Sequence, residues 1–110
     1  MYQGAVFFDA DGTLIDGPSG IFAPTEKTKE AIAQLREQGF LTVLATGRSQ
    51  CYVLPSLLLF DCYITANGAR SEAGGTVIHN QTIAPEALRT LVTYLAMVGV
   101  NSVLEEPEYC

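Results

Sequence analysis

The chain is poor in basic side chains and holds few of the residues that carry specialised chemistry. Its 110 residues include no tryptophan, one histidine and only six lysines and arginines against twelve acids, which gives a formal net charge of -6. Nucleic acids and anionic membranes are bound through basic surfaces. The composition therefore argues against both classes of partner.

The sequence also lacks a segment that resembles a signal peptide or a membrane span. Residues 1–4 hold no basic side chain, and the apolar run that follows them is too short for either role. We therefore expect no contact with a membrane.

The cysteines show no pattern that is typical of a metal site. Cys51, Cys62 and Cys110 are odd in number and lack CxxC spacing, so we expect free thiols in the reducing cytoplasm. His79, the only histidine, falls in a region that is typical of a surface hairpin, which disfavours a catalytic thiol.

Apolar residues are abundant for a chain of this length. Hydrophobic residues make up 48% of the sequence and charged residues only 16%, which excludes a disordered chain. Such a surplus fits a fragment whose missing part covers the remaining apolar surface. We therefore expect the isolated chain to associate with itself or with a complementing chain.

The order of apolar runs and turn signals predicts an α/β fold. Continuous apolar runs indicate buried parallel strands, and helical spacing between them indicates βαβ connections. A Gly-Gly pair between short strand-like arms indicates a hairpin. In chain order we expect strand 5–8, a helix from Thr25 to Gly39, strand 40–45, a helix after Ser49 that Pro55 interrupts, strand 61–65, a hairpin around residues 74–75, helix 85–98 and a further strand beginning at 101–104.

Polar, glycine-containing sequence follows each of the three predicted parallel strands. Asp9 and Asp11 follow the first, residues 46–48 the second, and Asn67 with Gly68 the third. The carboxyl ends of parallel strands meet at one edge of a sheet, so these groups are expected to converge on one pocket. Two neighbouring carboxylates repel each other unless a cation lies between them or one keeps its proton. A phosphate ester is the substrate that fits these groups best.

The segment Asp9-Ala10-Asp11-Gly12-Thr13-Leu14 resembles the first motif of the haloacid dehalogenase superfamily of phosphohydrolases. Residues 45–48 (Ala-Thr-Gly-Arg) and 65–69 (Thr-Ala-Asn-Gly-Ala) resemble the Cof-type branch in kind, order and spacing. The resemblance implies a Rossmann-like, parallel three-layer core, with residues 1–81 as its first part and residues 82–110 as the start of an α/β cap. The third-motif lysine and the distal metal-binding acids of the family lie beyond this length. The resemblance therefore implies that the chain is the first part of a longer enzyme and that this part would be inactive alone.

The resemblance also assigns roles to the two acids. Asp9 would be the nucleophile that forms an aspartyl-phosphate. Mg²⁺ would bind one oxygen of Asp9 and the backbone carbonyl of Asp11. The Asp11 side chain would protonate the leaving group and later deprotonate the hydrolytic water. The expected substrate is a small phosphorylated metabolite, with sugar phosphates as the first choice.

Further residues are candidates for phosphate and substrate binding. Gly12 lets the backbone turn closely around a phosphoryl group, and the hydroxyl of Thr46 can reach the same oxygens. Gly47 and Arg48 continue this motif. The guanidinium of Arg48 fits a phosphate, a hydroxyl of the substrate or an acid in the cap. Asn67 either binds the substrate or is present only because asparagine favours a turn.

Other functions stay open within and outside this chemistry. Phosphomannomutase-like transfer uses a similar first motif, and a non-catalytic fragment that binds phosphate or metal is a further alternative. A phosphoacceptor domain like a response regulator is disfavoured, because no aspartate follows the third predicted strand.

Overall fold

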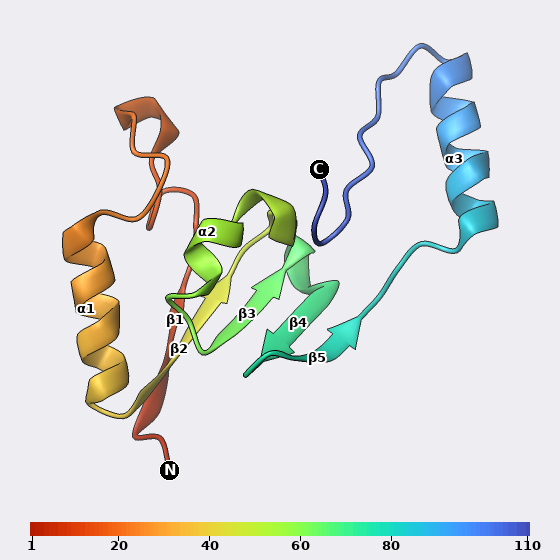
Figure 1. Ribbon diagram of the computed structural model, residues 1–110. Helices are drawn as coiled ribbons and strands as arrows, with labels where there is room; N and C mark the ends of the chain where they lie inside the picture. Colours follow the sequence, from red (N-terminus) through yellow and green to blue (C-terminus); the bar gives the residue numbers. More distant parts are fainter.

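The computed structural model describes residues 1–110 and shows a five-stranded mixed sheet with helices packed on one face (Figure 1). The strands lie in chain order, and the first three are parallel while the last two run antiparallel to their neighbours. This arrangement confirms the α/β fold. The strands are β1 (Gly4–Phe8), β2 (Phe40–Ala45), β3 (Cys62–Thr65), β4 (Arg70–Ala73) and β5 (Thr76–Asn80), and the helices are α1 (Glu26–Glu37), α2 (Leu54–Leu57) and α3 (Pro85–Met97).

Helix α1 has the ends that its sequence predicts. The side chain of Thr25 accepts a hydrogen bond from the backbone N–H of Thr28 at 3.3 Å and so caps the first turn. At the other end, Gly39 has a φ of +87°, the left-handed conformation that terminates many helices. Between the two ends, Ile32 is only 1% exposed and anchors the helix to the core.

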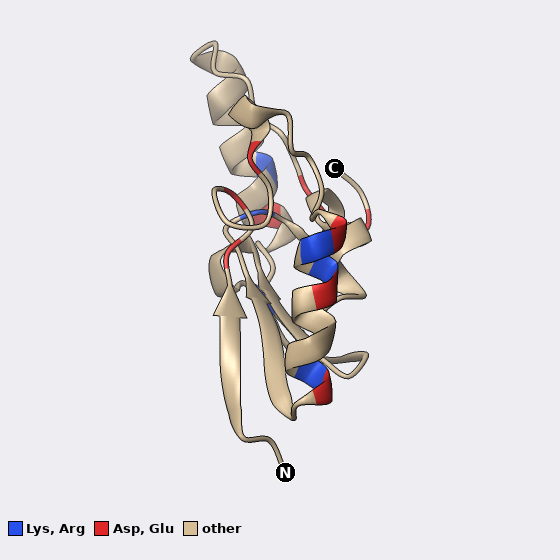
Figure 2. Ribbon diagram, turned by 90° about the vertical axis from the view of Figure 1, so that its left-hand side faces the viewer, with Lys and Arg blue, Asp and Glu red and all other residues tan.

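The core lies between the sheet and one layer of helices. Leu44 of β2 is fully buried, and it clusters with Ile32 of α1, Leu57 of α2 and Phe60. Both helices therefore cover the same face of the sheet. In Figure 2, α1 lies to one side of the strands and no helix runs along their other side. Phe7 and Phe8 are neighbours in β1, so their side chains point to opposite faces of the sheet. Phe7 lies on the face without helices and is 62% exposed.

The last two strands form the predicted hairpin. Gly74 and Gly75 connect β4 to β5 with φ angles of +56° and +79°. Two successive positive φ angles are typical of a type I′ turn, whose twist matches that of the flanking strands. Glycine is favoured at both positions because it adopts this conformation without strain.

Helix α3 stands apart from the sheet (Figure 1). The last backbone hydrogen bond between the sheet region and the segment before α3 joins the N–H of Gln81 to the carbonyl of Ala69 at 2.7 Å. The strand predicted at 101–104 is wrong, because this segment is irregular and no other strand pairs with it. Val103 and Leu104 are accordingly 71% and 57% exposed.

The C-terminal segment returns to the sheet and is held there by a disulfide. Cys51 and Cys110 are bonded, with their Cα atoms 5.8 Å apart, although 59 positions separate them in the sequence. The expectation of three free thiols is therefore wrong for this pair, and the cysteines no longer indicate a reducing compartment. Cys62 is the free cysteine. None of the helices has the length and apolarity needed to span a bilayer.

Candidate active site

The three parallel strands bring their carboxyl ends to one edge of the sheet. Phe8 lies opposite Leu44, and Ala45 lies opposite Ile64. Asp9, Thr46 and Thr65 therefore follow each other across the edge at nearly the same level. The segments that contain the sequence-predicted site residues all begin there.

The loop after β1 folds back on itself and leaves its two acids exposed. The carbonyl of Ala10 accepts hydrogen bonds from the amides of residues 13–15 at 2.9–3.3 Å, and the N–H of Gly12 donates to the carbonyl of Ile15 at 2.8 Å. Gly12 has a φ of +80°, which requires glycine for an unstrained turn. One oxygen of Asp9, Oδ1, accepts the N–H of Ala10 at 2.8 Å, whereas Oδ2 has no hydrogen-bond partner in the structure.

Arg48 binds the second acid of this loop with two parallel hydrogen bonds. Its Nε donates to Oδ2 of Asp11 at 2.7 Å, and its Nη2 donates to Oδ1 at 2.6 Å. These hydrogen bonds and the positive charge of the guanidinium lower the pKa of the Asp11 carboxyl. The sequence suggested a phosphate, a substrate hydroxyl or an acid of the cap as the partner of Arg48. In the structure its side chain binds Asp11.

Thr46 offers its hydroxyl at the end of β2. The side chain is almost fully buried, and Oγ1 accepts the backbone N–H of Arg48 at 3.1 Å. A hydroxyl that accepts one hydrogen bond still has its own proton to donate. Thr46 is therefore able to donate to an anion bound at the edge of the sheet.

The loop after β3 packs against the loop after β2. The carbonyl of Thr46 accepts the N–H of Asn67 at 3.2 Å, and the carbonyl of Arg48 accepts the N–H of Ala66 at 2.8 Å. Ala66 and Asn67 have φ angles of +50° and +54°, which are uncommon for residues with a side chain. Such strained backbone is concentrated at functional sites. The structure thus joins Asn67 to Thr46 and Gly47, while the side chain of Asp9 makes no hydrogen bond to them.

Two residues that the sequence analysis did not identify lie beside Arg48. The ring of Tyr52 lies with its centroid 6.0 Å from the guanidinium carbon, and Glu105 hydrogen-bonds the side chain of Ser49. An open hollow of about 350 Å³ is lined by Gly47, Arg48, Ser49, Tyr52 and Glu105. Tyr52 lies in the short 3₁₀ helix Gln50–Tyr52, whereas Arg48 precedes this helix, so no helical spacing in the sequence signals their contact. Nothing in the sequence connects Glu105 with this region.

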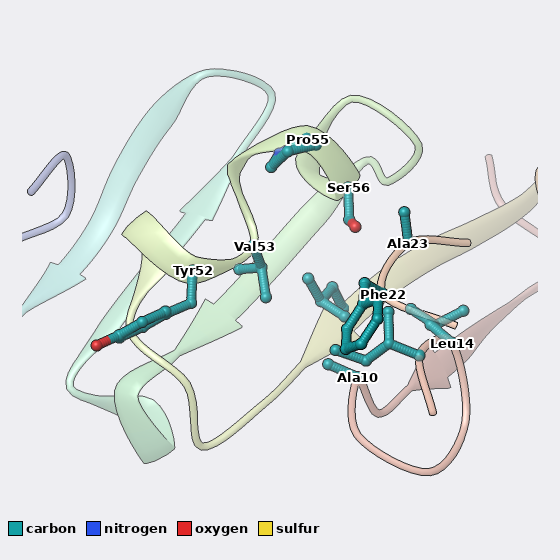
Figure 3. A pocket seen from close by; sticks show the side chains of 10 residues that line it. Ala10, Leu14, Phe22, Ala23, Tyr52, Val53, Pro55 and Ser56 are labelled. Carbon is teal, nitrogen blue, oxygen red and sulfur yellow. The ribbon is translucent and has the colours of Figure 1, made fainter. Parts of the chain in front are cut away.

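A separate small cavity lies under the loop after β1. It measures about 60 Å³ and is lined mainly by apolar side chains, among which the ring of Phe22 lies beside Ala10 and Leu14 (Figure 3). The hydroxyl of Tyr52 points away from the other labelled side chains. None of the predicted site residues lines this cavity, which makes it a packing gap of the core.

The loop after β1 offers oxygen ligands that suit a magnesium ion. Oδ2 of Asp9 is free, and no hydrogen bond ends on the carbonyl oxygen of Asp11. Magnesium is commonly held by one or two carboxylates, with waters and substrate phosphates completing its shell. No cluster of three or more His, Cys, Asp or Glu side chains that could hold a metal occurs in the structure. The loop therefore fits part of a magnesium shell.

Comparison with known proteins agrees with this geometry. Residues 6–109 match the family model for haloacid dehalogenase-like hydrolases. The chain is 34% identical over 89 residues to YkrA of Bacillus subtilis (strain 168), a protein assigned as a phosphatase, and the match covers 79% of the chain and 34% of YkrA.

Solved structures show the same relationship. A hypothetical protein of Geobacillus kaustophilus HTA426 superposes with a TM-score of 0.74 at 27% identity, covering 90% of this chain and 38% of that one. The subclass IIB sugar phosphatase BT4131 superposes with a TM-score of 0.67 at 31% identity, covering 88% of this chain and 38% of that one. The chain thus spans about a third of the length of these relatives. The resemblance to the Cof-type branch is confirmed, and the chain belongs to the haloacid dehalogenase-like hydrolase family.

Proposed function

We propose that the protein to which this chain belongs is a Mg²⁺-dependent phosphohydrolase that removes phosphate from small phosphorylated metabolites, with sugar phosphates as the substrate class. The observation that carries the proposal is the loop after β1, which holds Asp9 exposed at the sheet edge with one carboxylate oxygen free. The likeness to the sugar phosphatase BT4131 supports the substrate class.

In the first step, Oδ2 of Asp9 attacks the phosphorus of the bound ester. A new bond forms between this oxygen and phosphorus, while the bond from phosphorus to the leaving oxygen breaks. For this step the Asp11 carboxyl must carry a proton, which the ion pair with Arg48 disfavours because it lowers the pKa of the carboxyl. The proton passes from Asp11 to the leaving oxygen, so that the product departs as an alcohol. The Thr46 hydroxyl donates to a non-bridging phosphoryl oxygen and orients the group.

In the second step, water hydrolyses the aspartyl-phosphate. Asp11, now a carboxylate, takes one proton from the water as its oxygen attacks phosphorus. The bond between phosphorus and the Asp9 oxygen breaks, which returns Asp9 to a carboxylate and releases inorganic phosphate. Arg48 lowers the pKa of Asp11 and so favours the carboxylate that this step needs.

A magnesium ion held in this loop would neutralise negative charge on the Asp9 carboxylate and the phosphoryl oxygens. We assign one oxygen of the Asp9 carboxylate and the backbone carbonyl of Asp11 as the groups that would hold the metal. Both groups are exposed in the loop after β1.

We further propose a boundary between residues 81 and 82, with residues 1–81 in the catalytic core and residues 82–110 in the beginning of a cap. The last backbone hydrogen bond to the sheet region before α3, from Gln81, supports this division. We also propose that residues 1–110 alone are inactive. The two lysines of the chain, Lys27 and Lys29, both lie on α1, and no lysine follows the strands that carry the site.

The test is Asp9→Asn in the full-length protein, which keeps the shape of the side chain and removes its charge. We expect phosphatase activity with an aryl phosphate to fall by at least several hundred-fold, with an unchanged thermal unfolding midpoint. The matched control is Asp16→Asn, a second aspartate of the same loop region that lies outside the proposed site, and it should keep near-normal turnover. Acid-quenched mass spectrometry should locate phosphate on the peptide that contains Asp9. Near-normal turnover of Asp9→Asn would refute the mechanism.

A further inference from the structure

The guanidinium of Arg48 binds the carboxylate of Asp11 in a bidentate manner. Nε and Nη2 lie on one edge of the planar guanidinium, and each donates to a different oxygen of the same carboxylate, at 2.7 and 2.6 Å. Paired contacts of this kind fix direction as well as distance. The pair joins the loop after β1 to the loop after β2, across 37 positions of the sequence.

Arg48 is itself held by contacts within its own loop and by the loop after β3. Its backbone N–H donates to the hydroxyl of Thr46 at 3.1 Å, and its carbonyl accepts the N–H of Ala66 at 2.8 Å. The guanidinium carbon lies 6.0 Å from the ring centroid of Tyr52, within the range of a cation–π contact. The side chain that holds Asp11 is thus anchored to the ends of β2 and β3.

Asp11 has no other side-chain partner. Its side chain is 55% exposed, and both hydrogen bonds on its carboxylate come from Arg48. The hydrogen bonds of the surrounding turn fix the backbone of residues 10–15, and none of them involves the side chain of Asp11. Without Arg48, an exposed aspartate would sample several rotamers. A general acid must lie within hydrogen-bond reach of the leaving oxygen, so this freedom would cost rate.

We propose that Arg48 is the positioning residue of Asp11, which it aims at the leaving-group oxygen, and that Arg48 does not bind the phosphoryl group. This inference rests on the proposed function of Asp11 as general acid. It differs from the partners that the sequence suggested for Arg48, which were a phosphate, a substrate hydroxyl or an acid of the cap. It also explains why the residue after Gly47 is an arginine: a lysine carries the same charge but has no planar pair of donors.

The test compares Arg48→Lys with the parent enzyme in single-turnover phosphorylation of the full-length protein. Two substrates are used, a simple alkyl phosphate and an aryl phosphate whose leaving group needs little protonation. We expect the phosphorylation rate with the alkyl phosphate to fall by about 30-fold, less than the roughly 10²- to 10⁴-fold that general acid catalysis supplies, because Asp11 itself is still present. The rate with the aryl phosphate should stay within about threefold, because that substrate depends little on Asp11. KM should change little for either.

Arg36→Lys is the matched control. Arg36 uses the same two donor atoms on Asp61, with Nε at 3.0 Å and Nη2 at 2.9 Å from Oδ1, in an ion pair outside the proposed site. This substitution should lower the unfolding midpoint without any difference between the two substrates. A role of Arg48 that is only structural would give the same result for Arg48→Lys and would overturn the inference.

The remaining outcomes are equally distinct. Equal losses with both substrates, together with a raised KM, would show that Arg48 binds phosphate and would overturn the positioning role. Absence of phosphatase activity in the parent enzyme would instead refute the proposed function itself. The experiment thus distinguishes a failure of the positioning role of Arg48 from a failure of the proposed phosphatase function.

Discussion

Gly47 and Asn67 approach each other so closely that a Cβ atom added at position 47 would lie 2.9 Å from Oδ1 of Asn67. The two residues belong to the loops after β2 and β3, which the hydrogen bond from the N–H of Asn67 to the carbonyl of Thr46 also joins. A side chain at position 47 would thus crowd the neighbouring loop, whereas the backbone conformation of residue 47 does not itself demand glycine.

Gly47→Ala should therefore displace the side chain of Asn67. We expect a loss of about 1 kcal/mol in the free energy of unfolding, at the low end for overpacking, because Oδ1 is the end of an exposed side chain that can turn away. Urea unfolding of Gly47→Ala, Asn67→Ala and the double variant measures the coupling. In the Asn67→Ala background the alanine at position 47 should cost nothing. An undiminished cost there would show that the close contact is not the cause.

The sequence was sufficient to predict the elements whose signals are local. Apolar runs identified the three parallel strands, and the pair Gly74-Gly75 identified the hairpin of β4 and β5. Thr25 and Gly39 marked the ends of the first helix. The strand expected at 101–104 failed for a non-local reason. An apolar stretch becomes a strand only when another strand pairs with it, and the chain places none beside this segment.

For the candidate site too, the sequence predicted the features with local signals and missed those that depend on distant residues. The position of the acids after β1 followed from the pattern of the chain, because parallel strands deliver their carboxyl ends to one edge. The ion pair between Asp11 and Arg48 did not, since it depends on side-chain geometry across 37 positions. The disulfide between Cys51 and Cys110 was missed for a similar reason, because it forms only when the C-terminal segment returns to the sheet.

Asp61 gives the stability of the chain a dependence on pH. Burial alone would raise the pKa of this carboxyl, but hydrogen bonds from the backbone N–H and hydroxyl of Thr42, at 2.9 and 3.0 Å, and the charge of Arg36 hold it below its usual value. A lowered pKa means that the unfolded chain takes up the proton first as the pH falls. The stabilisation by Asp61 is therefore present above the unfolded pKa of about 3.9 and is lost as the pH falls through the folded value.

Asp61→Asn should remove this part of the pH dependence. We expect the substitution to cost about 1–3 kcal/mol at neutral pH, the range for hydrogen bonds to a charged group. Urea unfolding between pH 7 and pH 2.5 should show that the difference between the two proteins shrinks as the medium becomes acidic. Glu30→Gln, which removes an exposed acid of α1, is the control. A difference that is constant across the whole range would contradict the assignment to the Asp61 carboxylate.

The three cysteines should differ in their reactivity. Without reductant, a denatured sample should take up one equivalent of an alkylating reagent, at Cys62, because Cys51 and Cys110 are bonded to each other. In the native chain even Cys62 should react slowly, since burial and the neighbouring Asp61 raise the pKa of its thiol. Reduction before denaturation should raise the count to three. Mass spectrometry measures each state, and three reactive thiols without reduction would contradict the bond.

Strand β1 should make the isolated chain associate with itself. It lies at the edge of the sheet and pairs with β2 alone, so one row of its backbone N–H and C=O groups has no strand partner. Phe7 is 62% exposed on the face that no helix covers. An exposed apolar edge strand is a template for pairing with another chain, and we expect a second copy to occupy it.

Light scattering at about 100 μM, where exposed edges associate, measures this directly. The unmodified chain should exceed the mass of a monomer. Phe7→Lys places a charge on the edge strand and should shift the mass toward that of a monomer. The control, Leu58→Lys, introduces the same charge at a residue that is 88% exposed, directly follows α2 and is not part of β1, and it should leave the mass unchanged. If both substitutions lowered the mass equally, the association would arise from exposed apolar side chains in general and not from β1. A stable monomer of the unmodified chain would refute association through β1, because the edge would then be tolerated in water without a partner.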